Sequence, residues 1–422
     1  VTGVQTCALP ILSYIFISPS LLLVLIIIGI IFYSKNRKIT LMQKMILGES
    51  INSPLELTLS QITLGIISGT ILSVILSVLG IVFKENSGIE MLFLLAILII
   101  FFNKKVINIA YLGGIIGGLS IIVTCLNIFG TKNNFLKLDI RELVILVGVI
   151  YIIQGFLIMF DGSRGSIPIF SKNNGRVIGG YMLNRSWIMP IALFILLLNG
   201  INSNGLIENT IYPNWWPIIS NNKILQLIVT GTLIMVPYFS VVNYSSITFT
   251  KTKKMKTLSS GIYMVLYGFL CCLISFVTET GLAGKIFVVI MVPLIYEVIT
   301  RFSKKIEDKK KPIFYSDDRG ISVLEVVPLS KSYIAGIRAG DRITSIKGKY
   351  IESERDVYEA LMNNYTNVQL EIENLKGERK NIQVGKGKNL GLLLVPRTIN
   401  EKKKIDLTKK KINEILGKLK NS

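Results

Sequence analysis

The 422-residue chain contains no histidine, and this absence excludes every mechanism that needs an imidazole. Zinc proteases with an HExxH motif, Ser/His and Cys/His triads, histidine kinases and haem proteins with a histidine ligand are all ruled out. Charge is also scarce, because Asp, Glu, Lys and Arg make up 17% of the residues, whereas soluble proteins average about a quarter. Half of the residues are apolar and the mean hydropathy is +0.56. This composition indicates a membrane protein.

Cysteine is nearly as rare, with four residues in the chain. Cys125, Cys271 and Cys272 lie inside strongly apolar stretches, and no two cysteines have the C-x-x-C spacing of a metal site. They are typical of small core residues. We therefore expect no disulfide framework, no metal site and no cofactor.

The chain does not begin with a methionine, and its first eleven residues, VTGVQTCALPI, resemble the translation of a sequencing-library adapter. We interpret residues 1–11 as an artefact and leave them out of the predicted fold.

Apolar stretches of about 20 residues, the length that crosses a hydrocarbon core of about 30 Å, recur along residues 12–300. Candidate spans cover residues 12–33, 62–83, 91–102, 106–129, 143–160, 187–198, 224–242, 259–277 and 282–299, of which the third and sixth are short. The predicted fold of residues 12–300 is therefore an α-helical polytopic membrane bundle of about eight to nine spans.

Charges in and between the predicted spans indicate orientation and argue against transport. Alternate loops carry 14 Lys and Arg against 6 in the others, and cytoplasmic loops carry the excess, so we expect the C-terminal segment in the cytoplasm. The first eight spans contain no Asp, Glu, Lys or Arg, and the ninth has only Lys285 and Glu297 near its ends. Because ion pathways need intramembrane charges, a transporter or channel is a weak alternative.

Small residues recur at helical spacing in the second and fourth spans. They are Gly65, Gly69, Ser73 and Ser77, and Gly113, Gly114, Gly117 and Gly118. Such faces let helix backbones approach closely. Self-association into a homo-oligomer is one interpretation, and packing within a single bundle is the other.

The sequence changes character near residue 301, where charges become frequent. Residues 301–312 form a basic juxtamembrane linker that is suited to an anionic lipid surface. Residues 313–396 contain four period-two stretches, GISVLEVV, DRITSIKG, NVQLEIEN and RKNIQV, and two short helical stretches, which predict a small α+β module. Residues 397–422 hold eight Lys against three acids and form a basic tail, amphipathic or solvated.

The run GISVLEVVPLSKSYIAGIRAGDRITSIKGKYIESERDVYEAL resembles a bacterial-type PDZ domain. The resemblance implies that a peptide adds as an extra strand and packs against a helix. The peptide-binding residues that it implies are Arg319, Gly320, Ile321, Ser322, Val323, Leu324, Val357 and Leu361.

The turn that would hold a peptide carboxylate departs from the family pattern. Asp317 and Asp318 would repel a terminal carboxylate, Arg319 compensates in part, and the hydrophobic GLGF-like signature is missing there. Capture of a C-terminus and capture of an internal segment both remain open, as does a module that serves only as a spacer.

The whole architecture resembles the MinJ-like polytopic PDZ proteins of low-GC Gram-positive bacteria, also in the stretches GESINSPLELTLSQITLGIISG and VIGGYMLNRSWIMPI. That resemblance implies a non-catalytic adaptor in the cell membrane, at septum and poles, that bridges DivIVA to MinC and MinD in division-site placement. Cytoplasmic division proteins and the bilayer are the expected partners, and nucleic acid is not. An adaptor for a separate membrane protease is the alternative that we keep.

Overall fold

The computed structural model describes residues 18–102, 108–128, 136–173, 175–197, 216, 218, 232–363, 367–385 and 390–397. The adapter-like residues 1–11 and the basic tail after Arg397 lie outside the described residues, so the predictions for both segments stay as they were.

Five described helices are long and apolar enough to cross a membrane. They are α3 (Pro54–Leu79), α5 (Ile109–Ile128, of which the span ends at Leu126), α6 (Ile140–Asp161), α8 (Lys253–Ser275) with the following 3-10 turn η1 (Phe276–Thr280), and α9 (Leu282–Asp308). α2 (Pro19–Leu47) precedes them, and α4 (Ile89–Phe102) is shorter. The predicted count of eight to nine spans is therefore too high for the described residues.

Side chains at the helix starts explain where several of these helices begin. Ser53 and Thr252 accept hydrogen bonds from the backbone N–H groups of Glu56 and Met255, and Asp139 accepts one from Arg141. These oxygens satisfy donors that the first turn of a helix leaves free.

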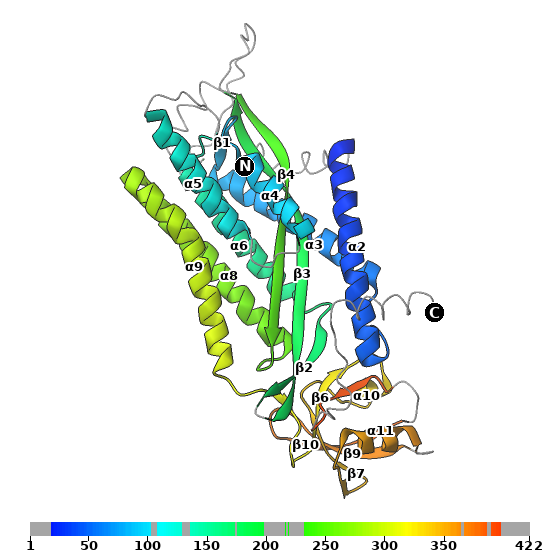
Figure 1. The fold of residues 1–422 in the computed structure, drawn as a ribbon. Coiled ribbons are helices and arrows are strands. Elements are labelled where there is room, and N and C mark those ends of the chain that lie inside the picture. The colour runs from blue at the N-terminus through cyan, green and yellow to red at the C-terminus, as the bar shows by residue number, and fades with distance from the viewer. Residues whose placement is uncertain are drawn as a thin grey trace.

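A long β-ribbon corrects two of the predicted helices. β3 (Arg176–Leu197) covers the predicted span 187–198, and β4 (Thr232–Thr248) covers the described part of the predicted span 224–242. The two strands pair antiparallel from Tyr181 opposite Thr248 to Leu197 opposite Thr232. Figure 1 shows this ribbon between α5, α6, α8 and α9 on one side and α2 on the other, and α3 crosses it.

β3 is the centre of the larger sheet. On the edge opposite β4, β3 pairs with β2 (Ile167–Asn173) and β1 (Val82–Lys84). β5 (Phe314–Tyr315) pairs with Ile178 and Gly179 on the same edge as β4, just beyond the end of that strand. Between β2 and β1 the edge is covered by α3, where the Ala192 N–H donates to Ser73 Oγ over 2.9 Å. Within a bilayer, non-helical backbone is tolerated only where protein covers it, and this packing meets that condition.

The small-residue faces are used inside the chain. Added Cβ atoms at Gly65 and Gly69 would lie 1.9 Å from the Ile188 carbonyl oxygen and 2.1 Å from that of Pro190 on β3. Gly114 and Gly117 on α5 approach Pro293 and Val289 of α9. Packing within one bundle therefore accounts for these faces, and they do not supply the surface that we considered for self-association.

The second sheet forms the PDZ module at the lower end of Figure 1. Its strands are β6 (Ile321–Val326), β7 (Arg342–Ile346), β8 (Lys349–Tyr350), β9 (Val368–Glu373), β10 (Arg379–Val384) and β11 (Leu392–Leu394), with helices α10 (Lys331–Ile334) and α11 (Glu354–Asn363). The strand order is β10-β9-β7-β6-β11, and β8 pairs with β7.

The module lies directly against the end of the ribbon. α9 continues to Asp308 and takes up most of the predicted linker 301–312. β5 then pairs with β3 at Ile178 and Gly179, and the Tyr181 hydroxyl donates to the Leu324 carbonyl. The module is therefore docked on the membrane part instead of swinging on a flexible tether.

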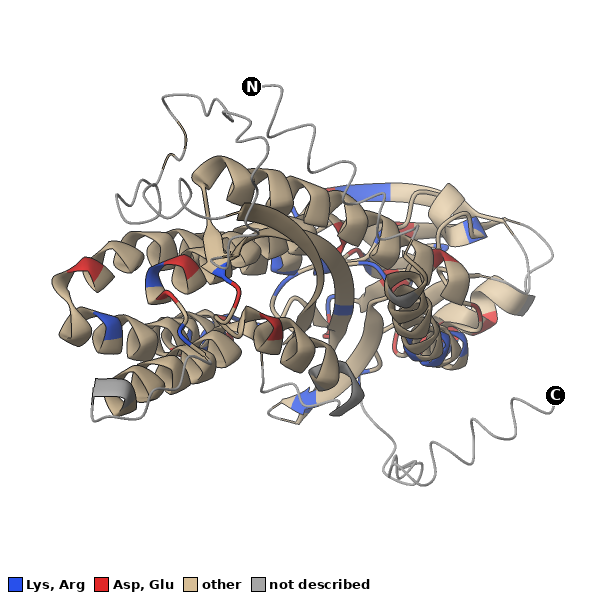
Figure 2. Cartoon of the chain, turned by 90° about the horizontal axis from the view of Figure 1, so that it is seen from above, with Lys and Arg blue, Asp and Glu red and all other residues tan. Residues whose placement is uncertain are grey.

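Charged residues gather toward the ends of the long helices, whose middles are mostly uncharged in Figure 2. Apolar side chains such as Ile67, Leu119, Leu273 and Ile290 are exposed along α3, α5, α8 and α9. Exposed apolar faces on charge-poor helices are what contact with lipid requires.

Candidate peptide-binding site

The core of the PDZ module forms between its sheet and α11. Ile321 and Val323 of β6, Val357 and Leu361 of α11, and Leu392 and Leu394 of β11 are buried in one hydrophobic cluster. Four of the predicted peptide-binding residues therefore fill the core, where a polar substitution would disturb folding. Val323→Asp would test the stability of the module and not its recognition of a peptide.

β6 does not have the free edge that the predicted site requires. On one side Ile321 and Ser322 pair with β7, and Val323 continues the contact by donating its N–H to the Asp341 carbonyl over 2.8 Å. On the other side Val323, Glu325 and Val326 pair with β11. A peptide beside β6 does not fit this arrangement, because both hydrogen-bonding edges of the strand are occupied.

Leu324 faces the membrane part of the chain. It is fully buried in the cluster that also holds Tyr181, Phe314 and Val395, and it lies against Gly179. Next to it, Glu325 forms an ion pair with Lys253 at the start of α8, with 2.7 Å between Nζ and Oε2. This face of β6 therefore docks the module and is closed to a partner.

The turn at Arg319 and Gly320 is closed on itself. The Gly320 N–H donates to the Asp317 carbonyl and the Arg319 N–H to the Asp317 carboxylate, at 3.1 and 3.0 Å. Ser322 gives its N–H to Ser316 Oγ at 2.9 Å. Since these donors already have acceptors, the turn offers little to a peptide carboxylate.

α11 is held at its N-terminus by the side chain of Asp356. The Asp356 carboxylate accepts the backbone N–H groups of Ser353 and Glu352 at 2.9 and 3.0 Å, as well as the Ser353 hydroxyl. These hydrogen bonds, led by the one from the Ser353 backbone, lower the pKa of Asp356. This contact is the half of a capping box in which an acidic side chain reaches back to the backbone N–H at the helix start.

β11 is the strand that sequence reasoning missed, and it lies at the edge of the sheet next to α11. Gly391 and Val395 turn their backbone groups toward β6, where they bond Val327 and Ser322. Because neighbouring residues of a strand alternate, the backbone N–H and C=O groups of Leu392 and Leu394 point away from β6. The Tyr358 hydroxyl of α11 donates to the Leu392 carbonyl over 3.0 Å and accepts the Leu394 N–H over 3.3 Å.

A signal for β11 was present in the sequence. Leu390, Gly391 and Leu392 give the hydrophobic–glycine–hydrophobic pattern that is absent at Arg319. Gly391 has a φ of 59°, and a Cβ there would lie 2.4 Å from the Ser330 Cβ, so only glycine fits. Gly391, which precedes β11, lies next to α11. It is at the opposite end of β6 from the turn at Arg319 and Gly320, where the sequence predicts carboxylate binding.

Comparisons with known proteins support the PDZ fold of the module. The PDZ domain family matches residues 322–374. The chain is 25% identical over 261 residues to the cell division topological determinant MinJ of Bacillus subtilis (strain 168), and the match covers 57% of this chain and 60% of that protein. No solved structure matches the chain. The chain therefore contains a PDZ domain after multiple apolar helices and distantly resembles MinJ, as its sequence indicates.

Proposed function

We propose that this chain is a non-catalytic, multi-pass membrane adaptor that recruits cytoplasmic partner proteins through its PDZ module and takes part in placing the division site. The observation that carries the proposal is a PDZ domain docked on a charge-poor bundle, with a strand edge beside α11. Modules of this kind recognise extended peptides by strand addition.

The docking edge that fits best is the outer side of β11. The backbone groups of Leu392 and Leu394 that point away from β6 have the two-residue spacing with which an added peptide strand pairs. Val357 and Leu361 of α11 lie in the hydrophobic core next to this strand. In this proposal Ile321, Ser322, Val323 and Leu324 support β11 from the adjacent strand. The peptide replaces the Tyr358 hydroxyl on the two outward groups.

The charge distribution supports a cytoplasmic PDZ module without depending on the number of spans. More Lys and Arg lie at the PDZ end of the membrane part than at its opposite end. Those at the PDZ end include Arg164, Lys172, Arg176, Lys251, Lys253, Lys254 and Lys256. Those described at the opposite end include Lys84, Lys137, Arg141 and Lys285. Because cytoplasmic ends carry the excess of positive charge, the PDZ end faces the cell interior.

The resemblance to MinJ supports the division role and suggests its partners, DivIVA on one side and MinC and MinD on the other. A module fixed at the membrane raises the local concentration of each partner, so that modest affinities act together.

The division role predicts a localisation and a phenotype in the source bacterium. We expect a fluorescent fusion of the chain to concentrate at septum and poles, and deletion to displace septa toward the poles. Fluorescence microscopy with septum mapping measures both. A fusion spread evenly round the membrane together with normal septa after deletion would refute the role, and co-purification of a membrane protease would favour the alternative adaptor.

Tyr358→Phe predicts a gain of affinity at the proposed docking edge. The substitution keeps the ring but frees the Leu392 carbonyl and the Leu394 N–H, and each hydrogen bond contributes about 1 kcal/mol. We expect peptides selected from a displayed library against the full chain in lipid nanodiscs to bind about thirtyfold more tightly, which corresponds to two hydrogen bonds. Fluorescence anisotropy of free-acid and amidated forms of each peptide measures this and separates terminal from internal recognition.

Tyr350→Phe is the matched control, because its hydroxyl bonds the Asp318 carbonyl and Arg397 and none of the residues of β11. It should leave the affinity unchanged. If Tyr358→Phe has no more effect than Tyr350→Phe, peptides do not use the β11 edge, and the proposed site is wrong even where the adaptor role holds.

A further inference from the structure

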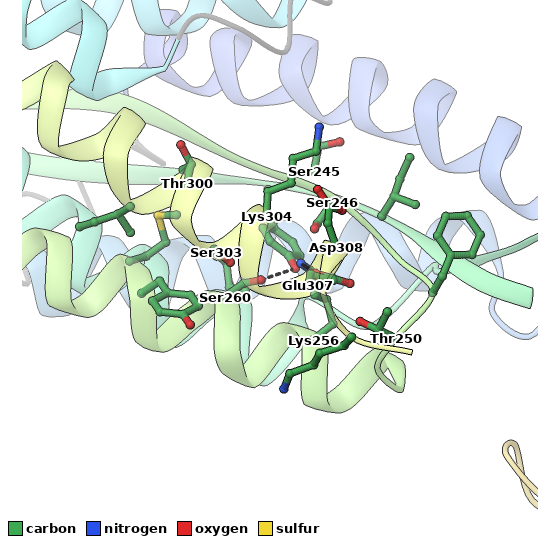
Figure 3. Close-up of a pocket in the computed structure, with 18 of the residues that line it drawn as sticks. Ser245, Ser246, Thr250, Lys256, Ser260, Thr300, Ser303, Lys304, Glu307 and Asp308 are labelled. Atoms are coloured by element: carbon green, nitrogen blue, oxygen red, sulfur yellow. Dashed lines mark hydrogen bonds and ion pairs between the residues drawn. The ribbon is translucent and has the colours of Figure 1, made fainter. Parts of the chain in front are cut away.

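A cavity of about 610 Å³ lies between β4, α8 and α9, near the place where the chain leaves the membrane part for the PDZ module. α8 begins at Lys253 and α9 ends at Asp308 beside it, so the cavity sits at the boundary between the apolar helices and the PDZ end. Figure 3 shows Ser246, Ser260, Ser303 and Glu307 converging on it from three elements. The PDZ groove does not include any of these residues.

The deep part of the cavity contains a carboxylate with an unused acceptor. Glu307 is 7% exposed, and its Oε2 pairs with the Lys256 ammonium, whereas its Oε1 has no hydrogen-bond partner. The Thr250 hydroxyl on the same cavity wall is also buried without a partner. A buried polar atom left unpaired costs about 1–3 kcal/mol, so these atoms point to a ligand with an O–H or N–H donor.

The mouth of the cavity is positively charged. Lys304 and Lys310 line it, and among the described residues neither ammonium belongs to an ion pair. Lys251 lies close by, and burial followed by the charge of Lys256 lowers the pKa of Lys251. Since Glu307 is already matched by Lys256, only Asp308 opposes the remaining ammonium groups, and an anion is favoured at the mouth.

The remaining lining is apolar and belongs to the membrane helices and the ribbon. Ile158, Met264 and Ile299 come from α6, α8 and α9, and Ile247 comes from β4. The cavity is thus amphipathic: a hydroxyl-rich and cationic region adjoins an apolar region at the depth of lipid head groups. A soluble phosphate would satisfy the first region and leave the second without a partner.

From these contacts we infer that the cavity binds one membrane phospholipid by its head group. The phosphate lies between Lys304 and Lys310, a hydroxyl or ammonium beyond the phosphate donates to Glu307 Oε1, and the start of an acyl chain covers Ile299 and Met264. Phosphatidylglycerol meets all three requirements, whereas phosphatidylcholine has the phosphate without the donor and diacylglycerol has a hydroxyl without the phosphate.

Lipid binding by the full chain in detergent micelles tests the inference by native mass spectrometry. We expect phosphatidylglycerol to bind more tightly than phosphatidylcholine or diacylglycerol. Lys304→Gln should weaken phosphatidylglycerol binding about fivefold, the effect of one lysine on an anionic lipid. Thr250→Val should weaken it without removing a charge, and gel filtration checks that both variants stay folded.

Lys305→Gln is the matched control, because Lys305 adjoins Lys304 in α9 but does not line the cavity. Equal losses from Lys304→Gln and Lys305→Gln would show general charge attraction and overturn the site. Equal binding of phosphatidylcholine would overturn the role of Glu307, and equal competition by soluble glycerol phosphate would overturn the lipid as the ligand.

Discussion

Gly65→Ala is expected to lower the thermal unfolding midpoint of the detergent-solubilised protein by on the order of 10 °C. The added Cβ would lie 1.9 Å from the Ile188 carbonyl oxygen and 2.8 Å from the carbonyl carbon, and both belong to the backbone of β3. A backbone contact cannot be relieved by a rotamer change, so α3 must move away from the ribbon. Overpacking alone costs about 1–3 kcal/mol, and exposing the uncovered edge of β3 adds to this cost.

Gly118→Ala in α5 is the matched control for this experiment. It makes the same chemical change in a helix of the same bundle, but its nearest neighbour would be Val289 Cγ1 at 3.9 Å, an ordinary contact. Both substitutions gain about 1 kcal/mol of helix propensity, so their difference isolates the clash. If the two variants unfold at the same temperature, α3 does not cover β3 as the structure shows.

The membrane helices could be predicted because each is a single continuous apolar run. Within each of α3, α6 and α8 the mean hydropathy is high over a stretch of 18 residues, and local composition decides the outcome. Such a run needs no information from distant parts of the chain, since a helix satisfies its own backbone hydrogen bonds.

The ribbon could not be recognised in the same way, because a hydropathy window does not distinguish a buried strand from a helix. Pro190 and Pro237 are weak hints: they lie inside the two runs and oppose Phe239 and Ala192 in the paired strands. Proline disfavours a helix interior, yet Pro293 lies inside α9. Two features decide that these runs are strands: β3 pairs with β4, and α3 covers the other edge of β3. Both depend on contacts between residues far apart in the sequence.

Within the PDZ module, the four period-two stretches gave β6, β7, β9 and β10 nearly at their true positions. The candidate site fell on β6, both of whose edges are paired, because β11 has only three residues and pairs with a strand about 70 positions earlier. Val357 and Leu361 were placed on the correct helix, since the amphipathic pattern of α11 is local. An edge strand and an interior strand differ in how many neighbouring strands they pair with, and the sequence pattern does not show this number.

Asp161→Ala is expected to destabilise the chain by about 3–5 kcal/mol. The Asp161 carboxylate accepts from Arg185 Nε and from Trp187 Nε1, each over 2.9 Å, and all three side chains are almost fully buried. Without it, the partners that Arg185 keeps among the described residues are the Leu57 carbonyl and the Ser60 hydroxyl. A guanidinium with no counter-charge would then remain buried where α3, α6 and β3 meet.

Two further variants separate loss of the ion pair from loss of packing. Arg164→Ala removes a half-exposed guanidinium 3.5 Å from Asp161 and should cost less than about 1 kcal/mol. Asp161→Ala combined with Arg185→Met removes both charges, so it should recover most of the stability lost in the single variant, less the contribution of the unpaired Trp187 N–H. Unfolding in mixed detergent micelles measures all three free energies. A double variant that is no more stable than Asp161→Ala would mean that the carboxylate acts mainly through Trp187 and not through Arg185.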